Sequence, residues 1–385
     1  MRFPEFTGEW EKCKLSKVCS FFSGGTPPSS NKEYYNGNIP FIRSGELHND
    51  ETELFITKEG LDNSAAKMVE VGDLLLALYG ATSGDIAISK IKGAINQAIL
   101  CIRTKQNKKF VESVWNKHVA RLLQTYLQGG QGNLSADIVK NIPFYFTNIE
   151  EQNKLARFIS LLDQRIAAQN KIIEKLQSLI KGLNDSLYKQ YGNAITTSFS
   201  DLGHSYSGLS GKSSEDFGSG KPFITYLNVY SNSVVNENEY QYVRINDGEK
   251  QNIVQCGDVL FTLSSETPEE VGVGSVYLGI DEVFLNSFCF GFHIDNKELA
   301  YPPYFSYYVS STPFRKFIYP FAQGSTRFNL CKADFEKASI KLPSLNNQKH
   351  IYAILNSIKG KIETEKNLLE YYTTQKQYLL RQMFI

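Results

Sequence analysis

Two short segments of this chain have residue types that could support catalysis, but neither has the spacing that such chemistry requires. The first, Phe22 to Thr26 (FSGGT), is a glycine-rich turn that could approach a phosphate closely. It lacks the G-x-x-x-x-G-K pattern of a phosphate-binding loop and the G-x-G-x-x-G pattern of a dinucleotide site. We therefore interpret it as a loop.

The second segment, Tyr301 to Tyr304 (YPPY), is similar to the Asn/Asp-Pro-Pro-aromatic motif of amino-methyltransferases. That motif holds the target amino group with an amide or a carboxylate, and Tyr301 supplies neither. We interpret the segment as the lead-in to a helix, with Pro303 at an early helical position. The sequence contains no G-x-S-x-G, no H-E-x-x-H and no outstanding pair of carboxylates, so it predicts no catalytic residue.

Metal ions, cofactors and membranes are not expected either. The five His residues are isolated, and the six Cys residues form no C-x-x-C pair, so no metal-ligand spacing is present. Without an export signal, we interpret these Cys residues as reduced thiols in the cytoplasm. No apolar run reaches the roughly 18 residues that a membrane span needs. We expect a cytoplasmic protein with no cofactor and no membrane partner.

Softer binding features occur in matched pairs along the two halves of the chain. Glycine, serine and threonine loops can approach a phosphate backbone and donate N–H groups, whereas amides and guanidinium groups can read base edges. The candidate DNA-binding residues of the first half are Ser23, Gly24, Gly25, Thr26, Arg43, Ser44, Tyr79, Thr82, Ser83, Gln128, Gln131 and Asn133. Those of the second half are Tyr226, Asn228, Ser264, Ser265, Gln323, Ser325, Thr326 and Arg327.

The elements that must position these loops include two long helices with a heptad seam. Seam residues follow each other in alternating steps of four and three, which is typical of a coiled coil. The first seam includes Leu155, Ile159, Leu162, Ile166, Gln169 and Ile173, and the second includes Ile351, Leu355, Ile358, Ile362, Glu365 and Leu369. The polar positions Gln169 and Glu365 match, and one polar seam residue can fix the register of a coiled coil.

The globular parts also repeat. The strand Ile39–Arg43 is matched by 221–225, the buried strand 71–78 by 256–263, and the helix 110–128 by 304–319. Such a repeat with changed loop lengths indicates one unit used twice. We predict domains at 1–148 and 193–343, a central long helix at 149–192 and a C-terminal long helix at 344–385. Residues 192–200 are expected to form a small-residue linker.

The predicted fold is α+β: two similar globular α/β domains separated by an antiparallel pair of long coiled-coil helices, with a pseudo-two-fold axis. A seam of this length would hold the domains roughly 40 to 60 Å apart. DNA repeats every 34–36 Å or so, so such a spacer suits the reading of two sites on one face of a duplex.

Charge does not by itself indicate a nucleic-acid partner. The net charge is +1, but residues 193–343 hold 11 basic and 17 acidic side chains. DNA binding would therefore depend on local basic faces rather than on bulk charge.

The ordered, duplicated set of motifs resembles the specificity (S) subunit of type I restriction-modification systems over nearly all 385 residues. The segments that carry the resemblance are Gly72-Asp73 and Gly257-Asp258, Asn133-Leu134 and Asn329-Leu330, Pro143 and Pro343, and Glu151-Gln152 and Asn347-Gln348.

The resemblance implies that the two globular domains are target recognition domains, each reading half of a bipartite site in double-stranded DNA. It implies that the helices set the spacing and dock two methyltransferase (M) subunits, which restriction/translocase (R) subunits join. It also implies that the chain is not itself an enzyme. The acidic second half departs from simple electrostatic expectation.

Two other functions remain open from the residues. A stand-alone or fused DNA adenine methyltransferase would need a cofactor motif, and saturable binding of S-adenosylmethionine would support it. A coiled-coil adaptor with no nucleic-acid role would give no sequence-dependent protection of DNA with any partner.

Overall fold

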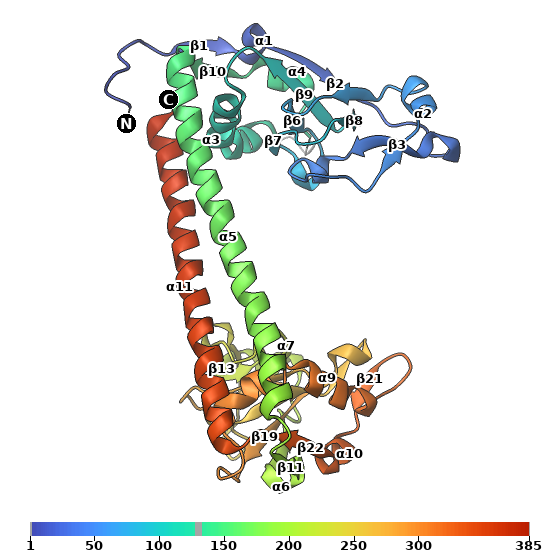
Figure 1. The fold of residues 1–385 in the computed structure, drawn as a ribbon, viewed down its shortest axis with the longest axis vertical. Helices are drawn as coiled ribbons and strands as arrows, with labels where there is room; N and C mark the ends of the chain where they lie inside the picture. The colour runs from blue at the N-terminus through green and yellow to red at the C-terminus, as the bar shows by residue number, and fades with distance from the viewer. Residues whose placement is uncertain (1, 128–132, 385) are drawn as a thin grey trace. The chain divides into compact units, whose positions relative to one another are not determined.

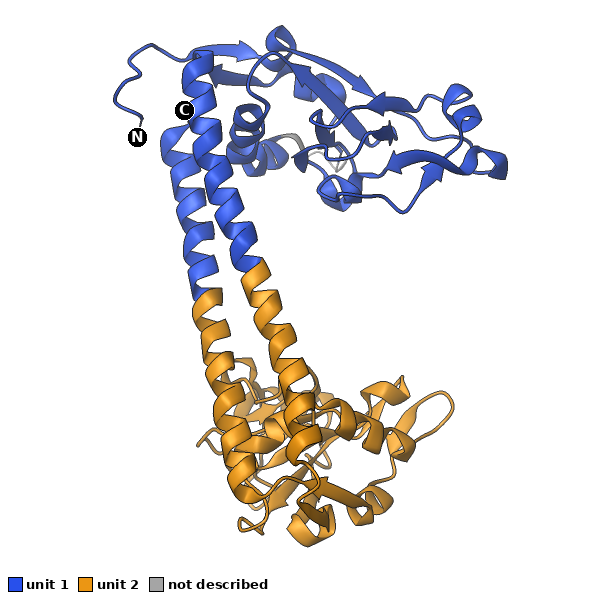
Figure 2. Ribbon diagram, viewed as in Figure 1, with its two compact units in different colours: residues 1–170, 367–385 blue, residues 171–366 orange. Residues whose placement is uncertain are grey.

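The computed structural model describes residues 2–127 and 133–384, which form two compact units (Figure 1). Unit 1 comprises residues 1–170 and 367–385, and unit 2 comprises residues 171–366 (Figure 2). Each unit therefore contains one α/β domain and one part of each long helix.

Unit 1 is built on two four-stranded sheets and a two-stranded sheet. Their strand orders are β2-β9-β6-β7, β4-β3-β8-β5 and β1-β10. The strands are β1 Glu11–Lys14, β2 Cys19–Ser23, β3 Tyr35–Ile42, β4 Phe55–Ile56, β5 Lys67–Val69, β6 Leu74–Ala77, β7 Ile86–Ile88, β8 Gly93–Ile95, β9 Ile99–Thr104 and β10 Pro143–Phe146. The helices are α1 Leu15–Val18, α2 Lys58–Asp62, α3 Lys108–Leu127, α4 Ala136–Asn141 and α5 Ile149–Tyr191, which continues into unit 2.

Unit 2 repeats this plan. Its sheets have the orders β12-β19-β15-β17, β14-β13-β18 and β11-β22, with an added β16-β21-β20 sheet. The strands are β11 Ile195–Ser198, β12 Gly203–Ser207, β13 Phe217–Ile224, β14 Gln241–Val243, β15 Val259–Thr262, β16 Ser264–Ser265, β17 Gly274–Val276, β18 Phe284–Leu285, β19 Cys289–Ile294, β20 Ala322–Gln323, β21 Phe328–Leu330 and β22 Ser339–Leu342. The helices are α6 Phe199–Leu202, α7 Tyr226–Ser231, α8 Phe305–Tyr308, α9 Thr312–Ile318, α10 Lys332–Lys337 and α11 Leu345–Met383.

The turn before the central buried strand is the same in both units. Gly72 and Gly257 have φ angles of +90° and +98°, which favour glycine because a Cβ would be strained there. The following Asp accepts a hydrogen bond from a backbone N–H three residues earlier, at 3.0 Å for Asp73 and 2.8 Å for Asp258. The Gly-Asp pairs therefore turn the chain into β6 and β15, and the predicted tandem repeat is confirmed.

The repeat departs from the sequence prediction in two places. Where unit 1 has the single helix α3, unit 2 has the two short helices α8 and α9. Pro313 lies at the start of α9, and its missing N–H and fixed ring favour a new helix start over continuation. The expected linker at 192–200 was wrong in part, because Ile195–Ser198 pair with β22 and α6 follows directly.

The long helices pair in an antiparallel manner within each unit. In unit 1, Leu155 and Ile159 near the start of α5 share a core with Leu380 and Met383 at the end of α11. In unit 2, Leu187 near the end of α5 packs against the core that contains Leu355 near the start of α11.

All the seam residues predicted from the sequence are buried or half-buried, and those of α5 and α11 include the polar Gln169 and Glu365. An ion pair between Asp163 and Lys376, 2.5 Å apart, joins the two helices in unit 1. The predicted antiparallel pair of long helices is therefore confirmed.

The same geometry links each domain to its long helix in both units. Gln152 donates to the carbonyl of Thr147 at 2.7 Å and accepts from the N–H of Asn107 at 3.1 Å. Gln348 donates to the carbonyl of Pro343 at 2.9 Å and accepts from the N–H of Tyr301 at 2.8 Å. Both glutamines are buried, so each fastens a loop of its domain to the first turn of its helix.

Candidate nucleic-acid interface

Backbone hydrogen bonds bring the polar loops of each domain together. In unit 1 the N–H of Leu134 donates to the carbonyl of Leu78 at 2.9 Å, and in unit 2 the N–H of Leu330 donates to that of Leu263 at 2.9 Å. The loop that follows each central strand therefore lies beside the end of each glycine-containing segment. Both loops contain candidate DNA-binding residues that the sequence predicted in each half of the chain.

In the first domain, Tyr79 and Asn133 are exposed, whereas Thr82 and Ser83 are half-buried. The Ser83 hydroxyl donates to the carbonyl of Leu78 at 3.0 Å, so it closes the loop on itself. The predicted residues Gln128 and Gln131 lie outside the described residues.

Arg43 is exposed, and two carboxylates neutralise it. Its Nη2 lies 2.6 Å from Glu46 and 3.0 Å from Glu53. Burial acts against ionisation of Glu46, but hydrogen bonds from Arg43 and Thr52 outweigh it and lower the pKa of Glu46 to about 2. Ser44 follows in the same turn and is half-buried.

Close packing explains the glycines of the first loop. A Cβ on Gly24 would lie 1.8 Å from the carbonyl oxygen of Ile95, and one on Gly25 would lie 2.5 Å from the Cβ of Ala65. Ser23 ends β2, and the Thr26 hydroxyl donates to the side-chain oxygen of Gln97 at 2.6 Å. This loop is thus fixed against its own domain.

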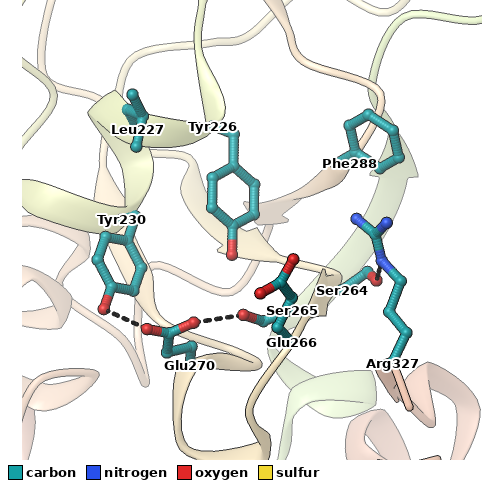
Figure 3. Close-up of a pocket in the computed structure, with 9 residues that line it drawn as sticks. All are labelled: Tyr226, Leu227, Tyr230, Ser264, Ser265, Glu266, Glu270, Phe288 and Arg327. Atoms are coloured by element: carbon teal, nitrogen blue, oxygen red, sulfur yellow. Dashed lines mark hydrogen bonds between the residues drawn. The ribbon is translucent and has the colours of Figure 1, made fainter.

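In the second domain, four of the predicted residues meet at one cavity of about 440 Å³ (Figure 3). The complete lining is Tyr226, Leu227, Tyr230, Ser264, Ser265, Glu266, Glu270, Phe288 and Arg327. The lining comes from α7, the β16 loop, the turn before β19 and the β20–β21 hairpin.

Hydrogen bonds fix the polar groups of this cavity. Glu270 accepts from the hydroxyl of Ser265 at 2.5 Å and from that of Tyr230 at 2.9 Å (Figure 3). These hydrogen bonds lower the pKa of Glu270, and the bond from Ser265 has the largest effect. The carboxylate therefore stays ionised at neutral pH. Arg327 donates from Nε to the hydroxyl of Ser264 at 2.7 Å, and its guanidinium lies 5.4 Å from the centre of the Phe288 ring.

The remaining predicted residues of this half do not line the cavity. Gln323 is exposed at the end of β20, and Ser325 and Thr326 are exposed on the turn between β20 and β21. Asn228 is fully buried, and its side chain bonds the backbone of Asn236, so it holds the end of α7 rather than facing solvent.

Sequence reasoning missed five of the lining residues: Leu227, Tyr230, Glu266, Glu270 and Phe288. Glu266 and Glu270 follow the candidates Ser264 and Ser265 in the same loop, and their position after the buried strand 256–263 was the available signal. Phe288 had no such signal, because an isolated aromatic residue in sequence is more often part of a core.

Within residues 2–127 and 133–384, no group of three or more His, Cys, Asp or Glu side chains could hold a metal ion. No helix in the described part of the chain is long and apolar enough to cross a membrane.

The fold is that of solved type I specificity subunits. The S subunit from M. genitalium covers 98% of this chain and is itself 96% covered, with a TM-score of 0.55 and 16% identity. A second solved structure concerns the complex assembly and conformational transition of the type I R-M system. One of its chains matches this chain with a TM-score of 0.63 and 16% identity, over 96% of both chains. At these identities the likeness concerns the fold.

The family follows from the sequence. The profile of the type I restriction modification DNA specificity domain matches residues 7–178 and again residues 198–371. The chain therefore belongs to this family and contains its domain twice.

Curated relatives agree with this membership. The MjaVIII specificity subunit of Methanocaldococcus jannaschii is 24% identical over 193 residues, which are 49% of this chain and 43% of that protein. The MjaIX specificity subunit of the same organism is 27% identical over 182 residues, 44% of this chain and 42% of that protein. The chain thus matches less than half the length of each.

Proposed function

We propose that this chain is the non-catalytic DNA-specificity subunit of a type I restriction-modification enzyme. Each α/β domain, 1–148 and 193–343, would read one half of a bipartite site in double-stranded DNA. The long helices, 149–192 and 344–385, would set the gap between the half-sites and dock the methyltransferase and restriction subunits. The single observation that carries this proposal is the presence of two copies of the specificity domain in one chain.

The candidate loops support sequence reading more than catalysis. They contain hydroxyl, amide and guanidinium groups, and such groups pair with base edges and phosphates. Because the candidate loops differ in residue type between the two domains, the two domains would read different half-sites.

An apolar cavity on α5 supports subunit docking in unit 1. Phe3, Phe158 and Leu161 line a cavity of about 470 Å³, and Leu161 is 55% exposed. Lys154 and Arg157 lie at the same cavity, so an apolar centre with a charged rim is available to a partner. We expect Leu161→Arg to reduce co-purification of the methyltransferase subunit, while Ala167→Arg, at another exposed position of α5, leaves it unchanged. Equal recovery with both variants would contradict this docking site.

The direct test of function is single-molecule sequencing of adenine methylation in host DNA, with and without this gene. Loss of methylation at one bipartite motif would support the proposal and identify the target. Replacement of residues 1–148 by another such domain should then change one half-site only. A change in both half-sites would contradict modular reading, and no change on deletion would contradict a role in methylation.

A further inference from the structure

We propose that Arg327 reads a guanine in the second half-site, through its guanidinium at the cavity of the second domain. This assignment rests on the proposed function, and it names one base of the target and the residue that reads it. The cavity is open to solvent, and Arg327 lies at one side of it beside Phe288 and Ser264 (Figure 3).

The side chain of Arg327 is held in one orientation before any ligand arrives. Its Nε bonds the hydroxyl of Ser264, a buried residue of β16, and the guanidinium lies against the ring of Phe288. Ser264 pairs with Asn329 in the β16–β21 ladder, and Arg327 directly precedes β21, so the anchor and the arginine lie at the same small sheet. A planar guanidinium fixed in this way loses little side-chain entropy when it binds.

The other two nitrogens of the guanidinium remain available to a ligand. Among the described residues, no carboxylate forms an ion pair with Arg327, whereas Arg43 has two such partners. Arg315 is also occupied, because its guanidinium donates to the backbone carbonyls of Gly272, Glu269 and Val271. Paired N–H groups at fixed spacing match the O6 and N7 acceptors of guanine in the major groove.

The rest of the lining favours a base edge over a phosphate. Glu266 and Glu270 belong to the same cavity, and their negative charge would repel a phosphate placed there. Leu227 is 69% exposed and Phe288 is 52% exposed, so large apolar surfaces face the ligand space. Neutral, partly apolar base edges suit such a lining, and an anion does not.

The described part of the first domain has no aromatic residue at the place of Phe288. The N–H of Leu263 donates to the carbonyl of Phe288 at 2.9 Å, and in the first domain the N–H of Leu78 donates to that of Ala98 at 2.8 Å. Ala98 thus stands where the second domain has Phe288, and an alanine cannot support a guanidinium. This way of reading a guanine should therefore act in the second half-site only.

The test compares three variants of the full chain in complex with its methyltransferase subunits. DNA binding is measured against a library in which each position of the bipartite motif is varied in turn. Arg327→Lys keeps the positive charge but loses the paired N–H groups of the guanidinium. Arg327→Gln removes both the charge and these paired N–H groups. Arg244→Gln is the matched control, because Arg244 is an exposed arginine of the same domain that does not line the cavity.

We expect both Arg327 variants to lose preference for guanine at one position of the second half-site by about 10- to 100-fold. Preference at the first half-site and at the other positions of the second half-site should stay unchanged, which also shows that both domains of the variants are folded, and Arg244→Gln should behave as wild type. The assignment is overturned if Arg327→Lys keeps the guanine preference, or if Arg327→Gln weakens all sequences equally, as loss of a phosphate contact would. If the wild-type complex selects no bipartite motif at all, the proposed function itself fails.

Discussion

Asp73 and Asp258 show how single residues hold the two domains in the same shape with different partners. Each caps the turn before its central strand, and each pairs with a side chain of the neighbouring strand: Arg103 at 2.7 Å and His293 at 2.6 Å. Burial acts against ionisation of Asp73, but hydrogen bonds from Arg103 and from the N–H of Glu70 outweigh it and lower its pKa. The Gly-Asp pairs, which are among the segments that carry the family resemblance, are therefore structural residues.

Gly24, proposed from sequence as a DNA contact, has a structural requirement that can be separated from binding. A Cβ there would meet the backbone of Ile95, so Gly24→Ala should lower the free energy of unfolding by about 1–3 kcal/mol. Chemical denaturation measures this change. Gly45→Ala is the control, because a Cβ at Gly45 meets no atom within 4 Å, and an equal loss in both variants would refute the packing explanation.

A buried ion pair predicts acid sensitivity in unit 1. The carboxylate of Glu151 is buried and accepts from Arg2 at 2.6 and 2.7 Å. Burial raises the pKa of Glu151, but the hydrogen bonds from Arg2 and Thr147 lower it by more than burial raises it. The pKa in the folded state therefore lies below the ordinary value. The pair therefore stabilises the fold above that ordinary pKa of about 4.3, and the stabilisation is lost as the pH falls toward the folded value.

Glu151→Gln should cost about 1–3 kcal/mol at pH 7 and flatten the fall in thermal stability between about pH 5 and pH 3. Melting temperatures across this range provide the measurement, and Glu150→Gln, at the exposed neighbouring position, is the control. Parallel pH profiles for wild type and Glu151→Gln would count against this role of the ion pair.

At the scale of elements, the end of α11 completes the core of the first domain. Phe384 is buried, and the centre of its ring lies 5.5 Å from the ring centre of Phe110 and 6.5 Å from that of Trp10. Lys117 of α3 donates to the carbonyl of Phe384 and fixes this end of the chain. The first domain therefore depends on residues that lie more than two hundred positions away in sequence.

Phe384→Ala should destabilise unit 1 by about 3–5 kcal/mol, because it leaves a cavity against two aromatic rings. Tryptophan fluorescence follows the change, since Trp10 is one of two tryptophans and contacts Phe384. Tyr378→Ala, at a position of α11 that is 54% exposed, should have little effect. Similar unfolding curves for Phe384→Ala and wild type would show that the contact does not support the domain.

At the scale of the whole molecule, the proposed role of the helices as a ruler depends on their seam. The insertion of seven residues into both α5 and α11, after Gln169 and after Glu365, keeps the heptad phase and adds about 10 Å. The gap between half-sites should then grow by about three base pairs. Methylation sequencing detects the new motif, and an unchanged gap would exclude the ruler.

The sequence by itself determined the duplicated fold, the heptad seams and the Gly-Asp turns. These are local patterns, because a helix seam requires apolar residues at regular spacing and a positive φ angle favours glycine at that position. Proline breaks also act locally, and the division of the second domain's helix into α8 and α9 could have been read from Pro313.

Only the tertiary structure decided which loop residues meet. Phe288, Ser264 and Arg327 approach each other because β16 pairs with β21 and the backbone of Leu263 bonds that of Phe288. The same geometry placed Asn228 inside the domain and gave Arg43 two carboxylate partners. Contacts of this kind depend on strand register and on the paths of loops between distant segments, and residue spacing along the chain does not encode them directly.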